Sequence, residues 1–423
     1  MSRLTAEMAT WVEASDTFAQ DRTGRLYVCR NGVYVPDGEA FLRARCLAFY
    51  EENNRASEWN RNAAAELIER IRIRAGRLVE TPPSDVLNVA NGLLDLKALK
   101  LADHSSEHRS TLQLPVRYDP QATCPRWDEF VAAVMPGCEA FLWELVGFML
   151  VPESPIQKII LLYGKGGNGK STLLGAITTL IGSNNVSNVT LQDLSGGDDY
   201  ASAELFGKLE NIFADLPARN IGDTGLLKAV TGGDEISAQF KFKDRFEFKP
   251  FAKLIFSANA LPKVADNSVG FWDRVQIVPM EQRFRGTEAD VAQSELLSKL
   301  RDPAELSGAL NKALEGRARL NANKRFSEPA RSRELKDEMR GKVGPVEQFL
   351  RDETRGASTG QVETQVLLER FNAWAQEHGY PEKTAGQFGK ELANLRPKVQ
   401  TARRGPRGAQ RSVYKGLTLK HTA

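Results

Sequence analysis

One stretch near the middle of the chain constrains most strongly what this protein can fold into. It runs from Ile159 to Thr172 and reads as a short apolar strand, a glycine-rich turn and the start of a helix. Gly164 to Ser171 fit the pattern G-x-x-x-x-G-K-[S/T], in the strand–loop–helix context that the pattern requires. The stretch therefore predicts an α/β domain that binds a nucleoside triphosphate.

The residue types in this loop suit a polyphosphate. Backbone N–H groups can surround phosphate oxygens only where side chains do not intrude, and the N-terminus of the following helix favours an anion. We expect Lys170 to reach the β- and γ-phosphates of ATP and the Ser171 hydroxyl to complete the shell of a Mg²⁺ ion. A glycine-rich loop without a ligand is the weaker alternative, because pattern and context agree. The predicted ATP-binding residues are Gly164, Gly166, Gly167, Asn168, Gly169, Lys170, Ser171 and Thr172.

Length and composition limit the class of protein. A chain of 423 residues with 41% hydrophobic and 26% charged residues is expected to fold as two to four domains. The net charge of +3 means that any nucleic-acid surface must come from local basic patches. Four scattered cysteines without a C-x-x-C pair argue against structural zinc and favour reduced thiols. There is no signal-like N-terminus, and no run approaches the ~18 apolar residues of a membrane span, so we expect a cytoplasmic protein without a membrane partner.

Three predicted strands that follow the loop each have a candidate catalytic residue at one end. Residues 208–215 form a predicted strand with Asp215 at its carboxyl end, where parallel sheets place ligands, so Asp215 can hold Mg²⁺ or polarise a water. The alternative is an aspartate that only opens a turn. Residues 253–259 predict a strand ending at Asn259, which can orient the hydrolytic water. Arg274 precedes a strand at 275–279 and is a candidate arginine finger for a neighbouring subunit; taken alone, it is more often a surface ion-pair partner.

A cationic hairpin is predicted between these strands. Apolar residues alternate with polar ones from Ile236 to Phe242 and again from Phe246 to Phe248. Lys241, Lys243 and Arg245 lie at or near the turn, where they are candidate DNA-binding residues. The alternative is a solvated hairpin tip, since charged tips are common.

The two ends of the chain are predicted to form separate domains. Residues 1–122 read as a mainly helical domain with a short hairpin at 26–36, and the basic run from Arg70 to Arg77 as a solvated helix face. Residues 340–423 predict helices at 346–352, 364–378 and 384–395, followed by a glycine-rich basic hairpin. This is the layout of a winged-helix DNA-binding domain, with a disordered basic tail as the alternative. The candidate DNA-binding residues of the wing are Arg403, Arg404 and Arg407.

Four motifs in this order resemble those of a superfamily 3 helicase. They are Gly164–Thr172, Thr231–Asp234, Phe256–Pro262 and Phe271–Arg274. The resemblance is to the helicase part of phage and plasmid primase-helicases, which is similar to the poxvirus helicase-primase. Asn91–Leu96 and Tyr118–Pro120 also resemble the region that precedes the helicase in that group. The resemblance covers about residues 85 to 290.

The resemblance implies an AAA+-like ATPase core, here residues 123–315, that assembles into a ring, usually a hexamer, and translocates on single-stranded DNA. It implies phosphate and metal binding by Lys170 and Ser171, the second acidic motif at Asp215 and the γ-phosphate sensor at Asn259. Arg274 becomes a finger that acts in trans, and the Lys243 hairpin points into the ring pore. This sequence departs from the pattern of the family in two ways. Many members have two adjacent acidic residues in the second motif, whereas here Ala214 precedes Asp215. No primase-like segment is recognised before the helicase part, so a separate primase is a possible partner.

The sequence therefore predicts a DNA-stimulated ATPase and DNA helicase that acts on single-stranded and forked DNA in the replication of a phage, satellite element or plasmid. The 3′→5′ polarity comes from the resemblance alone. Two other functions remain open: an origin-binding initiator or loader with little processive unwinding, and a DNA-binding module whose ATP site serves only as an assembly switch.

Overall fold

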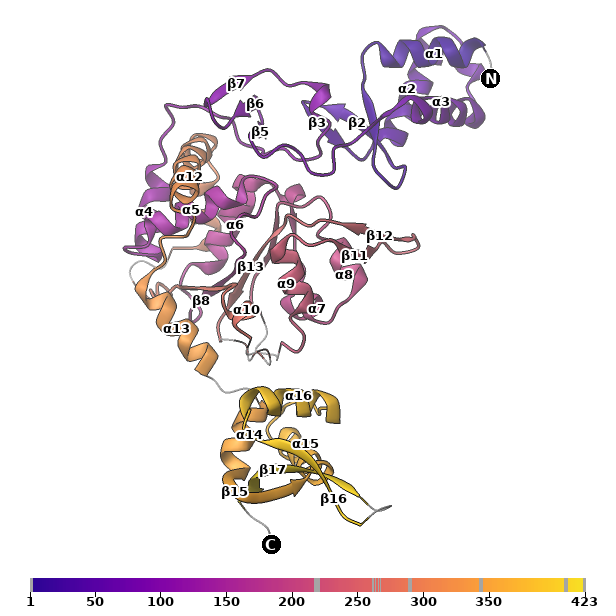
Figure 1. The fold of residues 1–423 in the computed structure, drawn as a ribbon. Helices are drawn as coiled ribbons and strands as arrows, with labels where there is room; N and C mark the ends of the chain where they lie inside the picture. The colour runs from indigo at the N-terminus through magenta and orange to yellow at the C-terminus, as the bar shows by residue number, and fades with distance from the viewer. Residues whose placement is uncertain are drawn as a thin grey trace.

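A computed structural model of the protein describes residues 3–216, 221–260, 262, 264, 266, 268–287, 291–341, 345–406 and 410–420. An N-terminal unit, a central α/β body and a C-terminal unit follow one another along the chain (Figure 1). In this described part no single helix has the length and apolarity to cross a membrane. Helices α4 (Pro125–Val134) and α5 (Glu139–Met149) have the required length and apolarity only when taken together, and a bend of 116° separates them.

The N-terminal unit combines three helices with a small sheet. Met8, Leu42 and Leu67, one from each helix, meet in its core. The predicted hairpin at 26–36 is present, with Asn31 and Gly32 at positive φ in its turn. Of the basic run, Arg72 pairs with Glu69 at 2.9 Å and Arg74 with Glu13 at 2.9 Å, as expected of a solvated helix face. The elements are α1 (Arg3–Glu13), β1 (Phe18–Gln20), β2 (Leu26–Arg30), β3 (Val33–Val35), α2 (Gly38–Glu52), α3 (Arg61–Arg74) and β4 (Gly76–Arg77), with sheet order β3-β2-β1-β4.

A second small sheet joins this unit to the central body. It consists of β5 (Val86–Val89), β6 (Gly92–Asp95) and β7 (Lys100–Ala102). The Asn91 amide donates to the Tyr118 carbonyl at 3.0 Å and its oxygen accepts from the Tyr118 N–H at 2.8 Å, so the two motifs preceding the helicase-like region are held together. Leu94 and Leu114 belong to the same core cluster as α5. The prediction of a mainly helical region up to residue 122 thus included only the hairpin of the first sheet and left out the second sheet, and packing is continuous across that position.

The central body is built around a five-stranded parallel sheet. Its strands are β8 (Ile159–Tyr163), β9 (Val186–Ser187), β10 (Glu210–Phe213), β13 (Lys253–Ala258) and β14 (Val275–Pro279), in the order β14-β8-β13-β10-β9. Successive side chains of a strand point to opposite faces, and both faces are covered. Ile160 and Leu162 therefore lie in one core cluster, while Ile159 and Leu161 lie in another. The predicted strands at 159–163 and 275–279 match fully, and those at 208–215 and 253–259 were predicted slightly too long.

Different helices cover the two faces of this sheet (Figure 1). One face packs against α4, α5, α6 (Lys170–Ile181) and α12 (Pro303–Asn323), with α11 (Gln293–Leu300) beside α6. The other packs against α7 (Leu191–Ser195), α8 (Asp199–Ala203), α9 (Gly225–Gly232), α10 (Val269–Trp272) and α13 (Ala330–Gly341). Helix α6 was expected from the sequence.

The predicted hairpin extends from the central body (Figure 1). It pairs β11 (Ile236–Gln239) with β12 (Arg245–Phe248), and Ala238 lies opposite Phe246. Arg22 of the N-terminal unit holds its side: the guanidinium bonds to Glu80 and to the Glu247 carbonyl, and it lies 5.8 Å from the ring centroids of Phe206 and Phe246. The hairpin is therefore fixed to the N-terminal unit at its base.

The C-terminal unit has its own core, with Phe349, Phe371, Trp374 and Phe388 in contact. The three predicted helices are present, and the third begins with a capping box between Thr384 and Gln387. The strand before the second helix was not predicted. The elements are α14 (Pro345–Glu353), β15 (Thr354–Glu363), α15 (Thr364–Glu377), α16 (Ala385–Leu395), β16 (Gln400–Arg404) and β17 (Arg411–Leu419), with sheet order β15-β17-β16.

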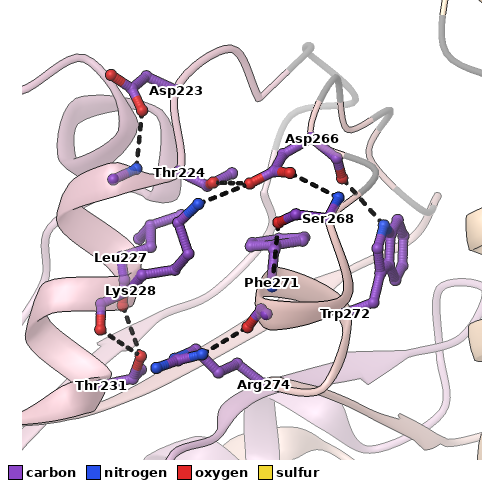
Figure 2. A network of polar contacts seen from close by, with 12 residues as sticks. Asp223, Thr224, Leu227, Lys228, Thr231, Asp266, Ser268, Phe271, Trp272 and Arg274 are labelled. Atoms are coloured by element: carbon purple, nitrogen blue, oxygen red, sulfur yellow. Dashed lines mark hydrogen bonds and ion pairs between the residues drawn. The ribbon is translucent and has the colours of Figure 1, made fainter. Parts of the chain in front are cut away.

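One polar network ties the start of α9 to the segment before α10 (Figure 2). The Asp266 carboxylate accepts hydrogen bonds from the Thr224 hydroxyl, from Lys228 at 3.0 Å and from the Ser268 N–H at 2.7 Å. Burial alone would raise the pKa of Asp266, but these hydrogen bonds outweigh it and lower that pKa to about 2. The ionised carboxylate therefore stabilises the fold.

We expect Asp266→Asn to lower the thermal unfolding midpoint at pH 7, because a carboxylate with a depressed pKa contributes roughly 1–2 kcal/mol. This contribution is present above the unfolded pKa, near 4, and is lost as the pH falls toward 2, so the difference between variant and wild type should shrink over that range. The exposed Asp223 provides the matched control, Asp223→Asn. Equal losses for both variants, or a difference that persists at pH 2, would show that Asp266 does not act through its charge.

Candidate functional site

The glycine-rich loop joins β8 to α6 at the carboxyl edge of the parallel sheet. A Cβ atom on Gly164 would collide with the Met280 carbonyl and the Asn168 side chain. Gly169 caps α6 with φ +83°, and a Cβ there would lie 2.7 Å from Val134 Cγ1. The loop therefore requires glycine at these points, whereas a Cβ on Gly166 would meet nothing within 4 Å and faces open space.

The buried Lys170 ammonium holds the loop and the sheet edge together. It donates to the Gly164 carbonyl, to Asn168 Oδ1 at 2.9 Å and to Asn259 Oδ1 at 3.0 Å. Burial lowers the pKa of Lys170, and the charge of Asp215 partly offsets this. All three ammonium hydrogens thus point at oxygen atoms of residues that the sequence analysis had singled out.

Asp215 lies beyond the end of β10, in an unusual backbone conformation. Its φ is +63°, and its N–H donates to Ser257 Oγ at 3.1 Å on the neighbouring strand β13. The Asn259 amide donates to Asp215 Oδ1 at 2.8 Å. A line of hydrogen bonds therefore runs from Lys170 through Asn259 to Asp215, across the ends of two adjacent strands. A non-glycine residue at positive φ is uncommon and often marks a functional position.

The loop N–H groups and these side chains face one cavity of about 700 Å³. Within the described residues, the backbone N–H groups of residues 165–169 donate no hydrogen bond to a protein acceptor. The cavity lining includes Gly166, Gly167, Asn168, Gly169, Lys170, Ser171, Thr172, Asp215, Ser257 and Asn259. Open N–H groups beside an ammonium and a helix N-terminus form a site suited to an anion.

The residues present fit a nucleotide with a hard metal ion. The Ser171 hydroxyl and the Asp215 carboxylate both line the cavity, and Mg²⁺ prefers such oxygen ligands, one or two from protein and the rest from water and phosphate. The free N–H groups and Lys170 provide donors for phosphate oxygens. The chemistry of this donor set agrees with the predicted ATP and Mg²⁺ sites.

The opposite wall of the cavity was missed by sequence reasoning. It comes from α4 (Arg126, Glu129 and Phe130), from the segment after β14 (Phe284 and Arg285) and from α11 (Leu296 and Lys299). The Phe284 N–H donates to the Gly167 carbonyl at 2.8 Å, so this segment also fixes the loop. No local pattern marks these residues, because only the fold brings them to the loop.

Arg274 lies at the other edge of the sheet. It directly precedes β14, whose first residue, Val275, pairs with Ile159 at the start of β8. Its guanidinium donates to the Gly270 carbonyl at 2.5 Å and to Gln157 Oε1 at 2.6 Å (Figure 2 shows the contact with Gly270). The structure therefore separates Arg274 from its own chain's cavity, as a residue acting on a neighbouring copy would be.

The candidate DNA-binding residues lie on two surfaces. Lys241 and Lys243 are exposed in the loop that joins β11 to β12, whereas Arg245 forms an ion pair with Asp199 of α8. Arg403 and Arg404 are exposed on β16 of the C-terminal unit, and Arg407 lies outside the described residues.

Comparisons with known proteins identify relatives of parts of this chain. A family model described as "D5 N terminal like" matches residues 48–136, and a "Family of unknown function (DUF5906)" matches residues 162–274. "Putative helicase L207/L206" of Acanthamoeba polyphaga mimivirus is 25% identical over 211 residues, covering 47% of this chain and 22% of that protein. "Putative helicase 022R" of Frog virus 3 (isolate Goorha) is 31% identical over 169 residues, covering 37% of this chain and 17% of that protein.

The solved "A form apo structure of NrS-1 C terminal region-CTR" aligns with 96% of this chain and 97% of that chain, at 12% identity and a TM-score of 0.47. The matched part of this chain spans only about a fifth of the length of the curated relatives, 22% and 17% for the two above. The two family models match residues 48–136, which precede the glycine-rich loop, and residues 162–274, which include it. Parts of this chain are therefore similar to viral proteins named as putative helicases and to the D5 N terminal like and DUF5906 models.

Proposed function

We propose that this protein is an ATP-dependent DNA helicase that works as a ring of identical copies on single-stranded DNA, during replication of a phage, satellite element or plasmid. The observation that carries the proposal is the hydrogen-bonded line from Lys170 through Asn259 to Asp215 beside a loop of free N–H groups. The helicase names of the viral relatives support the same assignment. A hexamer is the form that we expect from the family resemblance.

The site residues have separate tasks in this proposal. The loop N–H groups and Lys170 bind the triphosphate, and Lys170 exchanges its present oxygen partners for phosphate oxygens. Ser171 and Asp215 hold Mg²⁺, which neutralises charge on the phosphates when it is bound. Asn259 contacts both Lys170 and Asp215, so it orients the two groups relative to each other and to the attacking water. The general base beside Asp215 is left unassigned.

Two further parts complete the proposed machine. Arg274 stabilises transition-state charge in the cavity of the neighbouring copy, since it lies at the opposite edge of the sheet from its own loop. The exposed lysines of the β11–β12 hairpin hold the DNA backbone in the pore. The three helices and three-stranded sheet of the C-terminal unit have the order of a winged helix, with α16 as recognition helix and the β16–β17 loop as wing, and we propose that they bind duplex DNA.

The phosphate site gives the first test. We expect Lys170→Ala to lower ATP turnover by about a hundredfold or more, because the variant has no cation to place on the transferred phosphoryl group. Asp215→Asn should still bind ATP in a calorimetric titration but hydrolyse it far more slowly, because only the metal-binding and water-activating charge is removed. The exposed Lys165 of the same loop lies outside the cavity lining, so Lys165→Ala is the matched control. If Lys170→Ala hydrolyses ATP as fast as the control, the glycine-rich loop has no role in the reaction.

Mixed rings test the position of Arg274. Arg274→Ala alone should hydrolyse ATP poorly, and so should Lys170→Ala alone. Mixtures of the two variants should recover activity, because some cavities then combine an intact loop with an intact arginine from the neighbouring copy. Subunit exchange is checked in parallel by energy transfer between labelled copies. Exchange without any recovery of ATP turnover would contradict the action of Arg274 in trans.

The two basic surfaces should bind different forms of DNA. Lys243→Ala should weaken single-stranded DNA binding for all sequences and reduce unwinding of a forked duplex. The dependence of affinity on salt should become shallower, with the log–log slope falling by about 0.7 for each phosphate that the protein no longer neutralises. The double change Arg403→Ala and Arg404→Ala should instead reduce duplex binding and leave single-strand binding intact. The reverse pattern in titrations of both DNA forms would place the translocating surface in the C-terminal unit.

A further inference from the structure

The β11–β12 hairpin and its connecting loop carry four phenylalanines, and one of them behaves differently from the others. Phe240, Phe246 and Phe248 pack around Phe206 of the central body, with ring centroids 6.2, 5.4 and 5.3 Å from it. Phe240 and Phe246 also stack at 4.9 Å. Phe242, in contrast, is 90% exposed, more than any other large hydrophobic residue of the described chain. Three rings stiffen the hairpin and the fourth points into solvent.

The backbone holds Phe242 in this position. Its φ is +62°, in the left-handed region that bulky residues rarely adopt. The Lys243 N–H donates to the Phe240 carbonyl at 3.0 Å, and the Gln239 side chain donates to the Lys243 carbonyl at 2.9 Å, which closes the turn around Phe242. An unfavourable conformation that exposes an aromatic ring persists only when the surrounding structure enforces it, and such positions gather at functional sites.

The charges beside Phe242 identify the kind of ligand. Lys241 and Lys243 flank it and are both exposed, and Lys241 Nζ lies 5.3 Å from the Phe242 ring centroid. An aromatic ring between two cations matches single-stranded nucleic acid, in which phosphates alternate with bases that expose their flat faces. A contact with the same tip of a neighbouring copy is disfavoured, because that tip carries the same two lysines and repels them.

We propose that Phe242 stacks on a base of single-stranded DNA, while Lys241 and Lys243 contact the adjacent phosphates. This inference rests on the proposed function of the hairpin and adds contact with the bases to contact with the backbone. Stacking of this kind accepts any base, because every base has a π-face. A fully stacked duplex offers no such face, so Phe242 should contribute to the binding of single strands only.

A change in the DNA tests the proposal directly. Wild-type protein is titrated with a fluorescein-labelled oligothymidylate and with an oligomer of equal length and charge that lacks its bases. We expect the oligothymidylate to bind more tightly, and Phe242→Ala to remove this preference, with affinity for oligothymidylate falling by about 5- to 150-fold. Affinity for the abasic oligomer should stay unchanged. The salt dependence of binding should also stay as steep as in wild type, because both lysines still neutralise their phosphates.

Two substitutions and a control separate stacking from other roles. Phe242→Trp should keep the preference for bases, and Phe242→Leu should abolish it, because leucine is apolar but has no π-face. Ile73 of α3 is 72% exposed and far along the chain from the hairpin, so Ile73→Ala serves as a control for removal of a surface apolar group. Sedimentation of each variant shows whether the assembly state has changed.

Several results would overturn the proposal. Equal binding of both oligomers by wild type would exclude base stacking while leaving the proposed helicase function in place. A Phe242→Leu variant that keeps the preference would exclude a role for the aromatic face. If the Phe242→Ala variant sediments as a smaller species than wild type, the phenyl group of Phe242 contacts another subunit instead of DNA. Wild-type protein that binds neither oligomer would contradict the proposed function itself, not only the role of Phe242.

Discussion

The hydrogen bonds of the buried Lys170 ammonium are the interaction on which the site depends. Its three oxygen partners come from the start of the loop, from the loop itself and from the end of β13. An ammonium removed from water must keep its donors satisfied, so the three segments are held within hydrogen-bond distance of one point. Asn259 also donates a hydrogen bond to the Asp215 carboxylate, and the Asp215 N–H donates to the Ser257 hydroxyl. The Lys170 ammonium, directly and through Asn259, thus holds the glycine-rich loop and the Asp215 carboxylate in fixed relative positions.

The parallel direction of the sheet separates Arg274 from the cavity of its own chain. All five strands run the same way, so their carboxyl ends carry the loop, Asp215 and Asn259, while Arg274 precedes β14 at the amino ends. The five residues of β8 separate the two edges by about 13 Å, since a strand rises roughly 3.3 Å per residue. No arginine side chain spans that distance and also folds around the sheet edge. The proposed role of Arg274 is therefore restricted to the cavity of another copy, because its own cavity lies at the opposite edge of the sheet.

Sequence patterns predicted the parts of this fold in which local order and function coincide. The buried strand at 159–163 is a continuous apolar run, the strand at 275–279 is apolar apart from Gln276, and the hairpin and the three C-terminal helices have clear periodicity. Contacts between distant segments were not predictable in this way. The wall formed by Phe130 and Phe284 is one example, and the fully buried pair of Glu210 and Lys253 is another. Burial raises the pKa of Glu210 and lowers that of Lys253 to about 8, but in the sequence both residues look like ordinary strand-terminal charges.

A second set of contacts connects Arg274 to the hairpin. Arg274 bonds to Gly270 in α10, and the segment before α10 carries Asp266, which grips the first turn of α9 through Thr224 and Lys228. Helix α9 ends at Gly232, and β11 begins four residues later, at Ile236. Only three residues, 233 to 235, therefore separate α9 from the hairpin. Arg22 holds the other strand of the hairpin to the N-terminal unit. The hairpin is thus attached through one strand to α9 and through the other to the N-terminal unit, while its stacked phenylalanines pack against Phe206 of the central body.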